Sequence, residues 1–539
     1  MSPAMSPPPT TRSGSTLVLT VLASSQFLMT LDTSVMNVSM ATVAQDVGTT
    51  VTGIQTAITL YTLVMASTMI TGGKVGTILG RRRALAIGLM VYGVGSFVTG
   101  LAPNLAVLLV GWSLLEGLGA ALIMPAIVSL VAANFLPERR SAAYGLVAAA
   151  GAMAVAVGPL LGGTVTTFFS WRYVFFGEVV IVLVILLALR KVKNVPPERV
   201  SLDLISSVLS VAGLAMVVFG VLRSSEWGWI RSTPGGPELL GVSPVIWLLV
   251  VGLLVLYGFM RRQSALLDRG KVPLVDPHLM SDRQLTGGLG MFFAQFVVQA
   301  GVFFTVPLFL SVVLELSALE TGLRILPLSI ALVFAAAGIP KLRPHANPRR
   351  VVRAGLGVMI VGIAILTAGM DPGADAAVVA VPMLLMGLGL GALASQLGAV
   401  TVSAVPDSQS AEVGGLQNTA TNLGASLGTA LIGSVMIATL TSSAVVGIEN
   451  NPAVPPSVQQ EADTRLASGV PFLSDTQLEK ALSDAGVEET TRDAIVEVNK
   501  DARLEALQTA FGITALLAVA ALFGTGRLPR RAVGSEPGG

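Results

Sequence analysis

The chain has no cysteine and only two histidines among its 539 residues, and it is poor in charge. The absence of cysteine excludes thiolate catalysis, cysteine-ligated metals and a disulfide-stabilised secreted fold. His278 and His345 are too few for a histidine-rich metal site, and we expect no metal. Charged residues make up 12% of the chain, about half the share found in soluble domains. The sequence therefore excludes a soluble multidomain enzyme.

The sequence is rich in long apolar stretches. Hydrophobic residues make up 53% of the chain, and the mean hydropathy is +0.77. A bilayer core about 30 Å thick needs roughly 20 apolar residues per helix. Fourteen stretches meet this requirement, namely 16–39, 51–72, 82–101, 105–133, 142–166, 174–190, 204–222, 245–260, 285–313, 321–340, 352–370, 376–400, 411–440 and 508–526. We therefore predict an all-α integral membrane protein with 14 transmembrane helices.

The distribution of lysine and arginine sets the expected orientation, because these residues collect in cytoplasmic connections. With the N-terminus inside, 24 of the 33 lysines and arginines fall in cytoplasmic segments. We expect a multi-pass protein of the plasma membrane with both termini in the cytoplasm. Its expected partners are the lipid bilayer and a small-molecule substrate. We expect no nucleic-acid partner and a monomeric state.

The spans and their connections divide the chain into segments. We expect a disordered cytoplasmic tail (1–15), an N-terminal six-helix bundle (16–200), two linker helices (201–262), a cytoplasmic loop (263–284), a C-terminal six-helix bundle (285–526) with an extracytoplasmic insertion (441–507), and a cytoplasmic tail (527–539). The second half of the insertion, from Ser474 to Leu507, has helical spacing and is expected to run into the last span.

The class of membrane protein follows from what the helices carry. No phosphate-binding G-x-x-x-x-G-K-[ST] motif is present, so the chain has no ATP-binding loop of that kind. Fifty-eight glycines allow close helix approach, and isolated intramembrane acids are what cation-coupled transport requires. These features favour a secondary transporter over an enzyme. We expect no cofactor, with the proton as the coupling ion.

Three local patterns are more specific. The first span contains LDTSVMNVSM (Leu31–Met40), the connection after the second span reads GGKVGTILGRRRAL (Gly72–Leu85), and the fifth span contains GPLLGG (Gly158–Gly163). Together they resemble the major facilitator superfamily, in particular its 14-span drug:proton antiporter branch. The resemblance implies the major facilitator fold, in which two six-helix bundles surround a cavity, with two extra helices between them, here Leu204–Met260.

The same resemblance implies a function. Members of this branch are multidrug efflux antiporters, which suggests a proton-coupled exporter of amphiphilic or cationic small molecules. Two alternatives stay open at this point. One is export of a lipid or an endogenous metabolite, and the other is a non-transporting membrane receptor or sensor of the same fold.

Two intramembrane acids are the leading candidates for coupling protons to substrate. At 1.5 Å per residue, Asp32 lies about 24 Å from the inner end of its span and Glu116 about 16 Å from the outer end of its own. Their similar depth predicts that they line one cavity. The resemblance implies an acid at the position of Asp32. It also implies an arginine at the position of Ser113 and a glutamine at that of Glu116, so coupling here departs from the family pattern. Alternatively, neighbouring hydroxyl groups hold Asp32, and Glu116 makes a helix-packing hydrogen bond.

Further candidates are weaker. The secondary positions are Glu178, for which an ion pair with Arg172 is the favoured interpretation, Glu412, Gln295 and Gln299. The conformational motifs retain Gly73, Gly80, Arg81 and Arg82 in the loop after span two, and Gly158, Pro159, Gly162 and Gly163 in span five. Thr77 and Ile78 replace the aspartate and arginine of the family's loop motif, which puts its charged latch in doubt.

Overall fold

A computed structural model describes residues 12–135, 137–192, 197, 203–232, 236–343, 346–371, 373–405, 410–456, 459 and 472–530, without the side chains of some helical positions in these ranges. The expected tails, 1–15 and 527–539, fall largely outside this description, although the first helix already begins at Arg12.

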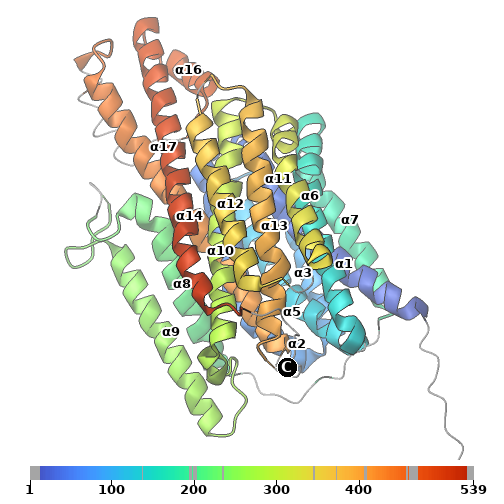
Figure 1. The fold of residues 1–539 in the computed structure, drawn as a ribbon. Helices are drawn as coiled ribbons and strands as arrows, with labels where there is room; N and C mark the ends of the chain where they lie inside the picture. The colour runs from blue at the N-terminus through green and yellow to red at the C-terminus, as the bar shows by residue number, and fades with distance from the viewer. Residues whose placement is uncertain are drawn as a thin grey trace, which may run out of the picture.

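Helices account for nearly all of the described residues (Figure 1). The α-helices are α1 (Arg12–Asp46), α2 (Val51–Leu79), α3 (Arg81–Gly100), α4 (Leu105–Leu108), α5 (Gly117–Asn134), α6 (Pro137–Phe168), α7 (Arg172–Leu189), α8 (Leu204–Trp227), α9 (Pro244–Asp268), α10 (Arg283–Leu308), α11 (Ala318–Leu342), α12 (Pro348–Gly369), α13 (Ala380–Val402), α14 (Ser410–Asn450), α16 (Asp475–Asp484) and α17 (Glu489–Gly524). Two π-helical segments, η1 (Leu109–Glu116) and η3 (Phe309–Val313), and three 3₁₀ segments, η2 (Pro277–Ser281), η4 (Ala376–Val379) and η6 (Thr525–Arg527), join them.

These helices confirm the prediction of an all-helical multi-pass membrane protein. Within the described residues, 13 helices are long and apolar enough to cross a bilayer. The fourteenth expected span corresponds to α6, in which Met153–Phe168 forms a shorter apolar helix. The ends of the spans differ from the expected ones, since α1 runs to Asp46, seven residues beyond the expected boundary.

The helices pack as two groups. In the first group α1 packs on α6, and α3 packs on α5 and α7; in the second, α10 packs on α14, and α13 packs on α11 and α12. The groups meet where α6 packs on α11 and where α2 packs on α14. The expected linker pair lies to one side of them (Figure 1). There α8 packs against α2, α14 and α9.

Two connections differ from the sequence-based expectation. The loop expected at 263–284 is shorter, because α9 continues as a helix to Asp268 and η2 occupies Pro277–Ser281. The insertion expected at 441–507 contains the end of α14, then α16, and then the long helix α17. The helical run from Ser474 is therefore interrupted once, at a turn where Gly486 has a φ of +73°, before α17 continues into the last span as expected.

Candidate functional site

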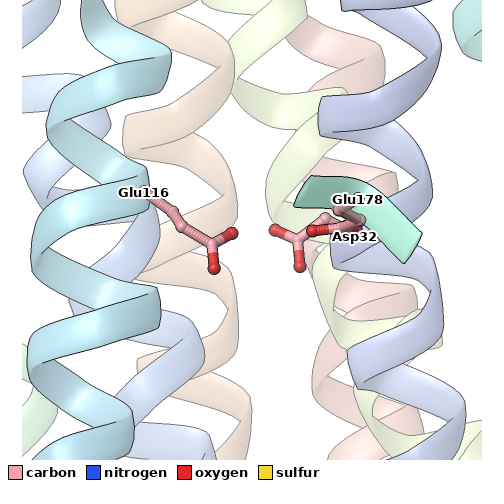
Figure 2. A group of neighbouring side chains, drawn as sticks. All are labelled: Asp32, Glu116 and Glu178. Carbon is pink, nitrogen blue, oxygen red and sulfur yellow. The ribbon is translucent and has the colours of Figure 1, made fainter. Parts of the chain in front are cut away.

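Three carboxylates from three different helices meet inside the first helix group (Figure 2). Asp32 lies on α1, Glu116 is the last residue of η1, and Glu178 lies on α7. Each offers a carboxylate oxygen, and these oxygens all lie within 4.8 Å of one another. The three residues are at most 1% exposed. We call Asp32, Glu116 and Glu178 the acidic cluster.

Asp32 is held by an aromatic pair. The Trp112 indole Nε1 donates hydrogen bonds to both Asp32 oxygens, at 2.8 Å to Oδ1 and 2.9 Å to Oδ2. The Trp112 ring stacks on Tyr61 of α2, with centroids 4.9 Å apart and an angle of 2° between the planes. Both rings are buried. The alternative in which neighbouring hydroxyls fix Asp32 does not describe this site, since the donor is an indole from another span.

The other two acids are held by hydroxyl groups of α3. Thr99 Oγ1 donates to Glu116 Oε1 at 3.2 Å, and Ser96 Oγ donates to Glu178 Oε2 at 3.1 Å. Tyr92 adds a long contact of 3.5 Å to the same Glu178 oxygen. Glu116 Oε2 and Glu178 Oε1 are buried and have no hydrogen-bond partner among the described residues. Each glutamate therefore has one oxygen that accepts no hydrogen bond from the part of the chain that the structure describes.

Local backbone structure brings Glu116 to this place. The π-helical turns of η1 carry both Trp112 and Glu116, and such segments occur frequently at functional sites. Gly95 of α3 allows η1 to approach closely, because a Cβ there would lie 2.6 Å from Glu116 Cγ and 2.7 Å from the Gly111 carbonyl oxygen. The absence of a side chain at Gly95 is thus a condition for the position of Glu116.

The interpretation of Glu178 as the partner of Arg172 is wrong. Arg172 forms its ion pair with Asp46 at the end of α1, and the indole of Trp171 donates to the same carboxylate at 2.8 Å. Arg172 Nη2 also donates to the Ala102 carbonyl at 2.9 Å. Glu178 lies six residues further along α7, and a separation of six residues places two side chains on different faces of a helix. Glu178 therefore points into the helix group as the third acid.

Of the remaining polar candidates, Gln295 and Gln299 lie outside the acidic cluster. Gln295 and Gln299 lie on α10 of the second helix group. Gln295 is buried, and its Oε1 has no hydrogen-bond partner among the described residues; Gln299 is half-buried. Glu412 belongs to α14, but its side chain lies outside the described part of the chain.

The span-five motif lies where α6 contacts its neighbours. Gly158 faces Ser34 of α1, and Gly162 faces Val35, where an added Cβ would lie 2.9 Å from Val35 Cγ1. Gly163 faces the carbonyl of Ala318, the first residue of α11. The Pro159 carbonyl in turn faces a glycine of α11. Gly158 and Gly162 thus allow α6 to pack closely on α1, whereas Gly163 and Pro159 form the close contact between α6 and α11 of the second helix group.

The retained loop motif forms a tight joint between α2 and α3. Gly80 is both the C-cap of α2 and the N-cap of α3, and its φ of +90° favours glycine. Arg81 donates to the Gly73 carbonyl at 3.0 Å, and Thr77 Oγ1 donates to the same oxygen at 3.2 Å. Arg82 donates to the Val192 carbonyl at 3.0 Å, beyond the end of α7. The joint therefore holds through backbone carbonyls.

Sequence reasoning missed Trp112, Tyr61 and the hydroxyls of α3. A signal for one of them was present, because Trp112 precedes Glu116 by four residues and so shares its face of the helix.

The acidic cluster offers only oxygen atoms as ligands. It could serve a hard cation, but Ca²⁺ takes six to eight oxygen ligands, more than three carboxylates supply as single ligands. Protons suit the cluster better.

Comparisons with known proteins agree with this architecture. The family profile described as Major Facilitator Superfamily matches residues 22–429. Over 427 residues, the chain is 30% identical to the cephamycin export protein CmcT of Amycolatopsis lactamdurans, covering 78% of this chain and 85% of that protein. It is 28% identical to the multidrug efflux pump LfrA of Mycolicibacterium smegmatis, covering 88% of this chain and 92% of LfrA.

Another relative is the puromycin resistance protein pur8 of Streptomyces alboniger, which is 29% identical over 77% of this chain and 81% of that protein. Among solved structures, a bacterial homolog of the human lysosomal transporter Spinster in an inward-facing and occupied conformation has a TM-score of 0.59 at 14% sequence identity. That alignment covers 98% of this chain and 100% of the other, and it shows a shared fold.

Proposed function

Because the chain belongs to the major facilitator superfamily and is therefore a membrane transporter and not an enzyme, we propose that it is a proton-coupled exporter of amphiphilic or cationic small molecules. Support for export comes from relatives that are named for drug efflux, antibiotic resistance or antibiotic export. Support for proton coupling comes from one structural observation, the acidic cluster.

The acidic cluster is suited to hold protons because its members are crowded and uncompensated. No lysine, arginine or histidine forms an ion pair with any of the three acids within the described part of the chain. Two unit charges separated by 4.8 Å repel each other by roughly 3–4 kcal/mol at an effective dielectric constant of about 20. Three carboxylates in this arrangement therefore share protons and titrate as one unit.

The hydrogen bonds indicate how the protons are divided. Asp32 accepts from Trp112 with both oxygens and contributes no donor to this contact, which suits the ionised form. Glu116 and Glu178 each keep one oxygen without a partner among the described residues. A proton on such an oxygen provides a donor that can turn toward Asp32 (Figure 2). In this proposal Asp32 carries the charge and the two glutamates carry the protons.

Coupling then requires that proton occupancy favour one conformation of the two helix groups. The acidic cluster lies within the first group, and α1, which carries Asp32, also contacts α10 and α11 of the second group. Loss of a proton adds charge to a buried site, and this cost favours a conformation that admits water to the cluster. Binding of a cationic substrate would favour the same state, and rocking of the two groups would exchange the two ligands across the membrane.

A transport assay in proteoliposomes tests this function. With an imposed pH gradient, the wild-type protein should accumulate a fluorescent lipophilic cation and move protons in the opposite direction. Asp32→Asn, Glu116→Gln and Glu178→Gln should each abolish gradient-driven accumulation while the protein stays folded. Glu449→Gln is the control, because Glu449 is exposed at the end of α14, outside the acidic cluster.

Three results would reject parts of the proposal. Wild-type accumulation in all three cluster variants would show that the protons travel elsewhere, with Glu412 as the next candidate. Equal loss in Glu449→Gln would show that the effect is not specific to the cluster. If the wild-type protein moves neither the cation nor protons, this substrate class is wrong.

A second candidate substrate is an endogenous metabolite. The observation in its favour is the similarity to the cephamycin export protein, whose name refers to export of a single antibiotic. The two candidates predict different phenotypes for a deletion strain. Sensitivity to many unrelated cations would support multidrug export, whereas retention of one metabolite in the cells, with unchanged sensitivity, would support metabolite export.

A further inference from the structure

Five arginines gather at one end of the second helix group. They come from the start of α10, the start of α12 and the chain after α17, and we call them the arginine cluster: Arg283, Arg349, Arg353, Arg527 and Arg530. Arg353 Nε donates to Thr525 Oγ1 at 2.8 Å. A Cβ on Gly526 would lie 3.6 Å from Arg349 Nη2. Arg353 and Arg530 lie near enough to Arg349 for their positive charges to repel its own.

A cavity opens among these helix ends. Its volume is about 540 Å³, and its lining consists of Met280, Ser281, Arg283, Thr286, Gly526 and Arg527. Two arginines and two hydroxyl groups thus face one hollow, and Gly526 in its lining lies beside Arg349. Such a lining offers hydrogen-bond donors and positive charge, which are the groups that bind phosphate oxygens.

Within the described residues, the arginine cluster has no carboxylate as a counter-ion. Among the residues that the structure describes, no carboxylate pairs with any of the five arginines. The Nε of Arg349 is buried and has no hydrogen-bond partner in the same set of residues. Asp282 precedes Arg283, but its Oδ1 accepts from the Leu285 amide at 2.7 Å as the cap of α10. The positive charges therefore repel one another unless an anion binds.

The arginines of the first helix group differ from the arginine cluster in their partners. At the α2–α3 joint, the comparable arginines are engaged by the protein itself, since Arg81 and Arg82 donate to the carbonyls of Gly73 and Val192. The same end of the molecule carries both sets, because Lys74 of α2 donates to the Pro273 carbonyl, just before η2. The arginine cluster, by contrast, combines several arginines with an open cavity, and the Nε of Arg349 has no hydrogen-bond partner among the described residues.

An apolar stripe leads to the cavity along α17. Leu516, Val519, Ala520 and Phe523 are exposed and follow the three- and four-residue spacing of one helical face. Phe523 is 84% exposed and lies three residues before Gly526. In a membrane protein this stripe faces acyl chains. A ligand that satisfies both features has an anionic head and an apolar tail.

We propose that the arginine cluster binds the phosphate headgroup of an anionic phospholipid, with an acyl chain along the α17 stripe. Arginines near the membrane surface attract anionic lipids, and basic pockets between helix ends are suited to their headgroups. This site is separate from the acidic cluster, and it does not depend on the proposed transport function. Bound lipid supplies a counter-charge that the described residues do not provide, and it joins α10, α12 and α17 at one end of the second helix group.

Native mass spectrometry of the full-length protein in detergent tests the site. Dioleoyl phosphatidylglycerol is the probe, phosphatidylcholine is the neutral reference, and inorganic phosphate is the soluble competitor. The variant Arg349→Gln/Arg527→Gln/Arg530→Gln removes three charges from the cluster. The matched control, Arg261→Gln/Arg269→Gln/Lys271→Gln, removes three exposed charges from α9 and the loop after it.

The wild-type protein and the control should retain phosphatidylglycerol in preference to phosphatidylcholine. The cluster variant should bind phosphatidylglycerol roughly 100-fold more weakly, from a factor of about five per arginine. Equal binding by the cluster variant, or equal loss in the control, would overturn the proposal. Displacement of the lipid by millimolar inorganic phosphate would instead identify a soluble anion as the ligand. If the triple variant does not fold, Arg530→Gln alone should weaken binding about fivefold, and unchanged binding would reject the site.

Discussion

The indole nitrogen of Trp112 donates to both carboxylate oxygens of Asp32, so one span holds the acid of another through a single N–H group. In Trp112→Phe the ring can still stack on Tyr61, but the donor is lost. A hydrogen bond to a charged group contributes about 1.5–3 kcal/mol, which corresponds to about 1–2 pH units. We expect the pH at which transport is half-maximal to rise by that amount, measured in proteoliposomes. An unchanged pH profile would mean that Trp112 only fills space.

Gly95 tests whether the position of Glu116 matters. In Gly95→Ala the new methyl group would meet Glu116 Cγ and the backbone of η1, so we expect a loss of about 1–3 kcal/mol of stability and at least a tenfold loss of transport. Gly177→Ala is the matched control, since Gly177 precedes Glu178 on α7 and a Cβ there has nothing within 4 Å. Thermal unfolding and transport rates measure the two effects. Normal transport in Gly95→Ala would show that the close fit is not needed.

The α2–α3 joint allows the family's charged latch to be restored. Thr77 and Arg81 already donate to the same Gly73 carbonyl, so an aspartate at position 77 would lie beside a guanidinium group. We expect Thr77→Asp/Ile78→Arg to remain folded and to shift the distribution of spin-label distances across this end of the molecule toward the closed state. Identical distances in the wild type and the double variant would show that such a latch has no role in this protein.

Asp203 gives a prediction for the dependence of stability on pH. Two hydrogen bonds of 2.7 Å from Arg262 hold its pKa well below the usual value, although burial opposes this shift. Because the pKa is lower in the folded protein, the ion pair stabilises the fold above the unfolded-state pKa of about 4 and loses this effect as the pH falls further. Asp203→Ser keeps a cap for α8 and should lower the unfolding temperature at pH 7. The difference from wild type should shrink below about pH 4, and a constant difference would contradict the assignment.

Labelling of single cysteines tests the expected orientation, and the native chain contributes no cysteine of its own. Ser264 lies exposed near the end of α9, and Ser483 lies exposed in α16. Ser474 is less useful as an outer position, since it is buried as the cap of α16. In intact cells, an impermeant maleimide should label Ser483→Cys but not Ser264→Cys. The reverse pattern would invert the topology.

The proximity of Asp32 and Glu116 could be predicted from their depth along the spans, because a helix advances by a constant rise per residue. Closeness in sequence favours an ion pair between Glu178 and Arg172. The direction of a side chain, however, depends on the helical period, which places positions 172 and 178 on different faces of α7. The π-helical form of η1 depends on packing against α3 and leaves no pattern in the sequence. Hydropathy marks the apolar part of a helix, so it did not show that α9 and α14 continue past their apolar stretches, to Asp268 and Asn450.

The joint at Gly80 connects the two helices that support the acidic cluster. One residue, Gly80, separates α2 from α3, so the connection between the two helices is short. Helix α2 carries Tyr61, on which Trp112 stacks, and α3 carries Thr99, which donates a hydrogen bond to Glu116. A change in the angle between α2 and α3 would therefore move both supports of the acidic cluster together, and a change in the charge of the cluster would act on both helices at once.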